Sequence, residues 1–379
     1  MRKTEGTPAP RFHNDPRIVL TLDAGGTTFE FSAIRGHQEV GASAVLAAEP
    51  NSLDKSLANL VRGFETIRQQ LPEPPVAISF AFPGPADYPR GIVANVGNLP
   101  AFRGGVPLGP MLEDHFGIPV FLNNDGDLFT YGEALSGFLP FVNRLLEEAG
   151  SSRRYRNLVG LTLGTGLGGG AVIDGRLVVG DNSAGGEVWL LRNKLDPETD
   201  AEEGASIRAV KRTYARAADI PFIRVPEPKE IYRIGIGEST GNREAAGEAF
   251  RRLGDVAGDV LAQALTLIDG LAVIGGGLSA AHPLFMTALV QSMNSSFRRP
   301  SGSLKRLIPR TFNLEDPLEL RDFLTTDVRS LPVPGSERTV SFDALPRTAV
   351  GLSRLGTGRA VSIGAYAFAL DRLDSADNG

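Results

Sequence analysis

The chain has 379 residues, of which 42% are hydrophobic and 22% charged, a composition that excludes a wholly disordered protein. Its net charge of −5 argues against a broad basic surface for nucleic acids, and the absence of cysteine excludes disulfides and thiolate zinc sites. No apolar run reaches the length of a membrane span, and the first residues lack the apolar core of a signal peptide. We therefore expect a cytoplasmic protein with no nucleic-acid or membrane partner.

The first predicted elements are two strands joined by a glycine turn. Residues 1–16 are polar and aperiodic, and we expect them to form a flexible tail. Residues 17–22 read as a buried strand, Asp23–Thr28 as a turn, and residues 29–33 alternate like a half-buried strand. Dinucleotide sites and P-loops need a helix directly after the glycines, so this hairpin disfavours both.

The rest of the first half alternates helices and strands. Apolar spacing predicts a helix over residues 53–71, and a buried strand follows at 76–81. A short strand at 120–122 delivers Asn123–Asp125 at its carboxyl end, and residues 139–148 form an amphipathic helix.

The second half repeats the opening arrangement. A strand at 158–163 leads into the glycine turn Gly164–Gly170, and a strand follows at 171–173. Either turn alone is compatible with an ordinary glycine hairpin. The two copies begin about 140 residues apart, and such a duplication favours two similar lobes that each open with a phosphate-facing hairpin.

Further along, residues 245–268 carry the apolar stripe of a long helix, and a buried strand ends at Gly275–Gly277. That glycine run suits either close packing against a nucleotide or a crowded strand-to-helix turn. Residues 298–355 are rich in arginine and proline, and we expect an insertion there. A helix at about 359–373 ends the chain.

The first turn has the chemistry of an anion site. Glycines allow backbone N–H groups to approach a phosphate, and the hydroxyls of Thr27 and Thr28 add donors. Asp23 can hold a water bound to Mg²⁺, because this ion keeps most of its hydration shell. The alternative is that Asp23 is an ordinary turn residue.

Taken in order, these segments resemble the ROK family, which includes sugar kinases and sugar-responsive repressors. The similarity covers about residues 17–280 and the final helix. The matching motifs are Leu22–Thr28, Phe82–Asp87, Asn98–Pro100, Asn124–Asp127 with Glu133, Leu163–Gly170, Gly185–Glu187 and Ile274–Gly277.

The resemblance implies an α/β, actin-like (ribonuclease H-like) duplicated fold with ATP and sugar in a cleft between two lobes. We expect an N-terminal lobe over residues 17–136 and a C-terminal lobe over 137–370. The final helix is expected to pack back on the N-terminal lobe.

The resemblance also assigns roles to the residues around the strand end at 120–122. Phosphoryl transfer to an alcohol needs a carboxylate that accepts the hydroxyl proton, and Asp125 matches that base. Asn98 and Asn124 match sugar ligands. From local sequence alone, Asn124 and Asp125 are also compatible with a turn that caps the next helix.

Two glutamates match further sugar ligands, with one departure from the family pattern. Glu187 lies in a Gly-Glu-x-x-His motif in which Leu190 replaces the histidine. Glu202 lies four residues before Ser206, the spacing of the second glutamate, whereas Glu203 is one residue out of register. Losing one neutral hydrogen bond costs about tenfold in affinity at most, so Leu190 predicts altered sugar preference rather than lost catalysis.

ATP and Mg²⁺ are the cofactors that the resemblance implies, with the metal near Asp23 through water and no zinc. Thr28 stands where many relatives carry lysine. The expected nucleotide-binding residues are Asp23, Gly25, Gly26, Thr27, Thr28, Gly164, Thr165, Gly166, Gly275, Gly276 and Gly277.

The leading prediction is therefore an ATP-dependent kinase for a hexose or a hexose derivative, and we expect a homodimer. One alternative is a sugar-sensing regulator without catalysis. Its relatives carry an N-terminal helix-turn-helix, whereas only 16 residues precede the first predicted strand here. Another alternative is a phosphatase or a polyphosphate-using enzyme on the same fold. Asn124, Asp125 and Glu187 speak against hydrolysis, because they match sugar ligands.

Overall fold

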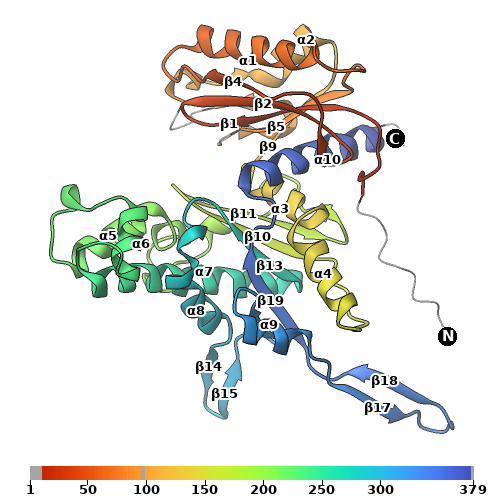
Figure 1. Cartoon of the computed structure of the whole chain (residues 1–379), viewed down its shortest axis with the longest axis vertical. Helices are drawn as coiled ribbons and strands as arrows, with labels where there is room; N and C mark the ends of the chain where they lie inside the picture. The colour runs from red at the N-terminus through yellow and green to blue at the C-terminus, as the bar shows by residue number, and fades with distance from the viewer. Residues whose placement is uncertain (1–10, 83, 85, 95–98, 377–379) are drawn as a thin grey trace. The chain divides into compact units, whose positions relative to one another are not determined.

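The computed structural model describes residues 11–376 except 83, 85 and 95–98 (Figure 1). Contacts divide the chain into two compact units. Unit 1 comprises Met1–Pro140, Gly170–Gly186 and Arg354–Gly379, and unit 2 comprises Phe141–Gly169 and Glu187–Ser353.

Unit 1 is built on a six-stranded sheet in the order β3-β2-β1-β5-β9, with β4 beside β2. β1 and β2 form the predicted antiparallel hairpin, whereas β1, β5 and β9 run parallel. All five residues of β5 are buried, Ser79 included, and the predicted buried strand is confirmed. The strands are β1 (Val19–Ala24), β2 (Thr28–Arg35), β3 (Gln38–Glu39), β4 (Ala44–Ala47), β5 (Ala77–Ala81) and β9 (Val120–Asn123).

The predicted helix after β4 is present as α1 (Leu53–Arg68) and ends before Pro72. α2 (Leu108–Phe116) follows a small sheet of β6 (Ala86–Asp87), β7 (Ile92–Val93) and β8 (Val106–Pro107). α4 (Phe138–Glu148) contains the chain's first crossing from unit 1 to unit 2.

The C-terminal helix α10 (Thr357–Ala376) packs against β1, β5 and α3 (Asp125–Leu135). Two glycines let the helices α3 and α10 approach closely. A Cβ on Gly132 would lie 2.0 Å from the Ala360 carbonyl oxygen, and one on Gly364 would lie 1.9 Å from that of Leu128. Any larger residue at these positions would push the helices apart.

Residues 11–17 also lie along α10. Arg11 forms an ion pair with Asp371, and Arg17 forms one with Asp374 at 2.7 Å. The Tyr366 hydroxyl accepts a hydrogen bond from the backbone N–H of Gly36 at 3.0 Å. These contacts join parts of the chain about 350 residues apart, so no local pattern could indicate them.

Unit 2 contains four parallel strands in the order β10-β13-β19-β16. They are β10 (Leu158–Leu163), β13 (Leu271–Gly275), β19 (Arg347–Leu352) and β16 (Arg310–Asn313). β11 (Leu167–Ile173), in which the boundary between the units falls, lies beside β10 and pairs with β12 (Arg176–Leu177). The order of strand, glycine turn and strand at 158–173 is confirmed, but the second strand begins at Leu167, so the turn is shorter than the predicted Gly164–Gly170.

Helices cover this sheet, and the longest is α7 (Arg243–Ile268), which packs on α8 (His282–Met293). Gly254 and Gly258 permit the contact, because a Cβ on either would lie 2.3 Å from a carbonyl oxygen of α8. The other helices are α5 (Ile207–Ala217), α6 (Pro228–Ile236) and α9 (Pro317–Leu324). No helix in the described part of the chain has the length and apolarity to cross a bilayer.

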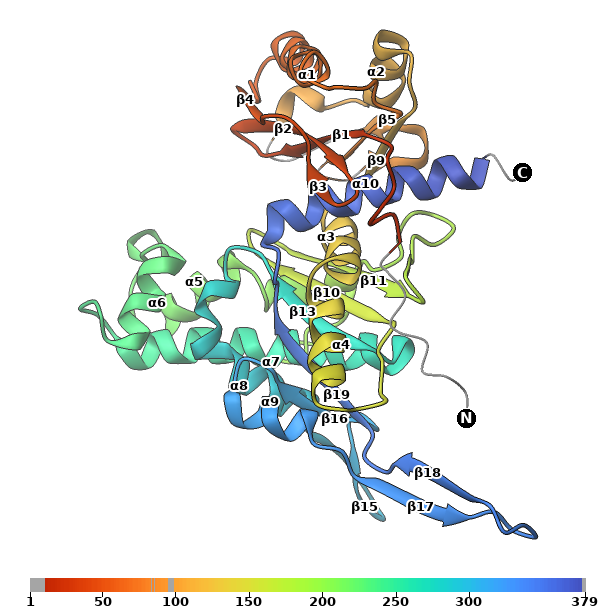
Figure 2. The same cartoon turned by 45° about the vertical axis from the view of Figure 1, so that its right-hand side comes forward.

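The segment expected as an insertion contains both hairpins and core strands. The hairpins β14 (Ser296–Arg299)–β15 (Gly302–Lys305) and β17 (Val328–Pro332)–β18 (Thr339–Asp343) extend away from the unit 2 sheet (Figures 1 and 2). In the sequence, β16 lies between the two hairpins and β19 follows the second one. Both strands belong to the unit 2 sheet.

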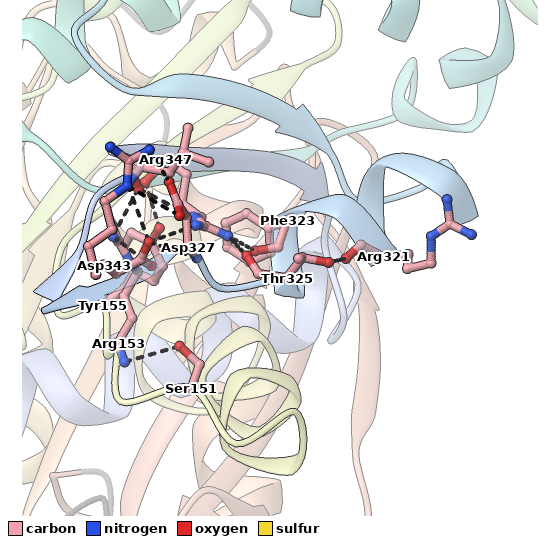
Figure 3. Close-up of polar contacts among 11 residues, drawn as sticks. Ser151, Arg153, Tyr155, Arg321, Phe323, Thr325, Asp327, Asp343 and Arg347 are labelled. Carbon is pink, nitrogen blue, oxygen red and sulfur yellow. Dashed lines mark hydrogen bonds and ion pairs between the residues drawn. The ribbon is translucent and has the colours of Figure 1, made fainter. Parts of the chain in front are cut away.

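β19 escapes recognition in the sequence because it begins with a buried arginine. The Arg347 side chain is 3% exposed, and it donates to the carbonyl oxygens of Phe323 (2.9 Å) and Thr325 and to Asp343 (2.9 Å) (Figure 3). The Tyr155 hydroxyl in turn donates to the Arg347 carbonyl oxygen at 2.6 Å. Every polar partner is supplied by neighbouring segments, so a charged residue is tolerated inside the unit.

Candidate active site

The first glycine loop joins β1 to β2 in unit 1. The Gly25 N–H donates to the Thr28 carbonyl oxygen at 3.0 Å, which closes the loop tightly. The N–H of Ala48, just after β4, donates to the Thr27 carbonyl oxygen at 2.9 Å. Both threonines are exposed, so their hydroxyls are accessible to a ligand.

Strand register places Asp23 at the same sheet edge as the end of β9. Asp23 pairs with Ala81 of β5, and Ala81 pairs with Asn123 of β9. Because these strands are parallel, their carboxyl ends meet at one edge. Asp23 at the end of β1 and Asn123, two residues before the predicted base, therefore lie at the same edge of the unit 1 sheet, with β5 between their strands.

Glu30 is a third acidic residue at this edge, and the sequence analysis missed it. It stands directly opposite Asp23 in the β1–β2 ladder, and both side chains are exposed. Desolvation raises the pKa of Asp23, and the charges of Glu30 and Asp125 raise it further. Counting the antiparallel register back from the turn would have paired Asp23 with Glu30.

Asn124 and Asp125 form the start of α3. The Asn124 side-chain oxygen accepts from the Gly126 N–H at 2.7 Å, so Asn124 is the N-cap that local sequence allowed. Asp125 accepts from the same N–H at 2.9 Å. Solvent reaches Asp125, yet desolvation by the surrounding protein raises its pKa, against a smaller opposite effect of the Gly126 hydrogen bond.

The other end of α3 is fixed by the buried carboxylate of Glu133. It accepts backbone N–H bonds from Phe138 at 2.6 Å and from Leu355 at 3.1 Å. These bonds join α3 to the start of α4 and to the segment before α10. The sequence analysis noted Glu133 as part of a motif, and the structure gives it an anchoring role for the helix that carries Asp125.

The second glycine loop joins β10 to β11. The Gly164 N–H donates to the Gly166 carbonyl oxygen at 3.0 Å, and Thr165 is exposed. Gly276 lies against the strand before this loop, because a Cβ there would be 2.4 Å from the Leu163 carbonyl oxygen. Gly276 also has φ +85°, a conformation that favours glycine. Two segments expected to bind nucleotide are therefore adjacent in unit 2.

Glu187 lies just before the short helix η3 (Val188–Leu190), also in unit 2. The Trp189 indole N–H donates to the Glu187 carboxylate. Trp189 is half-buried against the unit's core, whereas Leu190 is 61% exposed. The residue in the family's histidine position thus faces solvent, and the tryptophan beside it supplies a donor to the glutamate.

The segment after η3 returns to η4 (Ala201–Glu203), where the Ala201 N–H donates to the Leu191 carbonyl oxygen at 2.7 Å. Glu202 accepts from the Leu167 N–H at 3.1 Å. Glu203 points elsewhere and forms ion pairs with Arg208 and Arg212 of α5.

The structure thus gathers the predicted residues into two sets. Unit 1 brings together Asp23, the loop Gly25–Thr28, Asn124 and Asp125. Unit 2 brings together the loop Gly164–Gly166, Glu202 and the run Gly275–Gly277, with Glu187 on the neighbouring segment. Asn98 lies outside the described residues.

Comparison with known proteins gives an independent view. The model of the ROK family matches residues 19–314. N-acetyl-D-glucosamine kinase of Vibrio cholerae is 33% identical over 178 residues, which are 46% of this chain and 53% of the relative. The matched part therefore spans about half the length of that curated relative.

Two solved structures extend the comparison. A glucokinase from Parabacteroides distasonis is 53% identical, with a TM-score of 0.84 over 95% of this chain and 99% of its own. A ROK family glucokinase from Streptomyces griseus, in complex with glucose and AMPPNP, has 20% identity and a TM-score of 0.57 over 92% of this chain and 98% of its own. These likenesses confirm the expected actin-like α/β fold.

Proposed function

Because the chain belongs to the ROK family, we propose that it transfers the γ-phosphate of ATP to a hydroxyl of a hexose or hexose derivative. The observation that carries this proposal is the placement of Asp125. Its solvent-accessible carboxylate stands at the start of α3, directly after β9, at the sheet edge where β1 leads into the first glycine loop. The kinase relatives support the same reaction class.

In the proposed reaction, the oxygen of the sugar hydroxyl forms a bond to the γ-phosphorus, and Asp125 accepts the proton of that hydroxyl. The bond between that phosphorus and the β–γ bridging oxygen breaks, and ADP leaves. The raised pKa of Asp125 makes it a stronger base than an ordinary carboxylate. Asn124 and Glu187 present polar groups of the kind that sugar hydroxyls need.

The glycine loops suit the nucleotide. The N–H groups of Gly25 and Gly164 close the two loops, and those of Gly26 and Gly166 can approach phosphate oxygens without a side chain in the way. The exposed hydroxyls of Thr27, Thr28 and Thr165 add donors, and the run Gly275–Gly277 is proposed to pack against adenosine.

Mg²⁺ fits the acidic edge of unit 1. Desolvation and, after it, the charges of Glu30 and Asp125 raise the pKa of Asp23, and a divalent cation would favour its ionised form. No group of three or more potential ligand side chains gathers within the described residues, so Asp23 would hold the ion through water. When bound, the ion would neutralise phosphate charge that builds up during transfer.

A sugar panel with measured ADP release tests the proposal. Sugar-dependent ADP formation is the expected result, and comparison of hexoses, deoxyhexoses and N-acetylhexosamines would identify the substrate class. ADP formed without sugar would instead indicate a hydrolase, and no ADP at all a sugar-sensing regulator. Replacing ATP with polyphosphate tests the donor. A cytoplasmic homodimer remains our prediction for the protein's location and assembly.

A further inference from the structure

Glu202 connects a predicted sugar-binding segment to the second glycine loop. Its Oε2 accepts from the Leu167 N–H at 3.1 Å, at the end of the loop where β11 begins. Five residues later, the Ile207 N–H donates to the Gly164 carbonyl oxygen at 2.8 Å. The segment from Glu202 to Ile207 is therefore bonded to both ends of the loop.

Gly166, inside the loop, leaves the space that the Glu202 carboxylate occupies. A Cβ on Gly166 would lie 2.4 Å from Oε2, and the three atoms nearest to it all belong to Glu202. The φ angle of Gly166 is outside the left-handed region, so its backbone would accept alanine. Only the Glu202 side chain opposes a methyl group at this position.

The neighbouring acidic residue does not share this contact. Glu203 pairs with Arg208 and Arg212 of α5, whereas Glu202 comes only within 3.7 Å of Arg208 through its Oε1. The Glu202 side chain is 30% exposed, so Oε2 is committed to the loop while part of the carboxylate remains accessible. Two adjacent glutamates thus have separate partners and can be tested separately.

We infer that Glu202 is a positioning residue that holds the Gly164–Leu167 loop in the conformation that binds the phosphates of ATP. This inference rests on the proposed kinase function. A loop with glycines at both Gly164 and Gly166 has many conformations when free, and ordering them opposes ligand binding. A bond from a carboxylate to Leu167 fixes the loop beforehand. Because Oε1 can still meet a sugar hydroxyl, one side chain links sugar binding to loop order.

The test uses Glu202→Ala, Gly166→Ala and the double variant in the full chain. The dissociation constant for AMPPNP is measured by calorimetry without sugar, together with deuterium exchange of the peptide containing Leu167. Each single variant should weaken AMPPNP binding about tenfold, because each removes a hydrogen bond to a charged group. Each should also speed exchange at Leu167. The double variant should match Glu202→Ala alone, since the methyl group then meets no carboxylate.

Glu203→Gln is the matched control, since it removes the ion pairs to α5 and leaves the Leu167 bond in place. It should bind AMPPNP like the wild type. Unchanged AMPPNP binding and exchange in Glu202→Ala, or additive losses in the double variant, would overturn the inference. Absence of sugar-dependent ADP in the wild type would instead remove the proposed function, while the exchange result would still judge the loop contact.

Discussion

At the residue scale, the contact between Trp189 and Glu187 gives a specific expectation for sugar binding. The indole N–H holds the Glu187 carboxylate, and Leu190 beside it faces solvent. If Glu187 binds a sugar hydroxyl, losing this donor frees the carboxylate to adopt other orientations.

Trp189→Phe should therefore raise the KM for sugar several-fold, up to about tenfold, with a smaller effect on kcat. Initial rates at saturating ATP with sugar varied measure both constants. Tyr232→Phe is a suitable control, because Tyr232 is also a partly buried aromatic residue against the unit 2 core. An unchanged sugar KM in Trp189→Phe would show that the indole does not orient the glutamate in a way that matters for binding.

His37 is the second residue with a measurable consequence. It is 2% exposed and contacts Ser136, His13 and Tyr366. Burial, with a smaller contribution from the charge of His13, lowers its pKa to about 4. The unfolded chain, with an ordinary histidine pKa near 6.5, therefore binds this proton first as the pH falls.

The sign follows from linkage. The stability associated with neutral His37 is fully present above pH 6.5 and is lost as the pH falls toward 4, by about 3 kcal/mol in all. His37→Asn should reduce the slope of unfolding free energy against pH in that window by about 1.4 kcal/mol per pH unit. Asparagine suits the positive φ of 66° at this position. Denaturant titrations at several pH values give the slope, and an identical slope in both proteins would rule this assignment out.

At the element scale, the β17–β18 hairpin and β19 depend on the buried Arg347. Without Arg347, the carbonyl oxygens of Phe323 and Thr325 lose their donor, and Asp343 loses one of its two arginine partners, keeping Arg153 at 3.1 Å. Burial alone would raise the pKa of Asp343, but the Leu345 N–H and the charge of Arg347 outweigh it and lower that pKa.

Arg347→Met should lower the free energy of unfolding by about 3–5 kcal/mol. Urea denaturation of the full chain measures this loss. Arg329→Met is the control, because Arg329 lies on the exposed face of β17 and its ion pair with Asp327 is open to water. A loss of less than 1 kcal/mol in Arg347→Met would mean that the network contributes little to stability.

At the scale of the whole molecule, local sequence patterns predicted most helices and strands, but they did not predict contacts between residues far apart in the chain. The apolar patterns and glycine turns predicted the two strand–turn–strand segments, and apolar spacing with the prolines after it predicted α1. The structure confirms these elements. β19 was not recognised, because its arginine and threonine are buried only through partners on other segments.

The candidate site divides in the same way. Motifs in sequence order indicated Asp23, Asp125 and both glycine loops. The cross-strand neighbour Glu30 and the bond from Glu202 to Leu167 depend on register and on a contact 35 residues apart. The position of Glu30 could have been found by counting the hairpin register, whereas the bond from Glu202 to Leu167 joins two separate motifs and follows from neither.

The central claim is that Asp125 accepts the proton of a sugar hydroxyl, and Asp125→Asn tests it most directly. Asparagine keeps an oxygen for the Gly126 N–H but cannot act as the base. Exposed Asp54→Asn on α1 serves as the control. With ATP and the best sugar of the panel saturating, kcat should fall at least about a hundredfold in Asp125→Asn, and the AMPPNP dissociation constant should stay within about twofold of wild type. A kcat within about threefold of wild type would contradict the account.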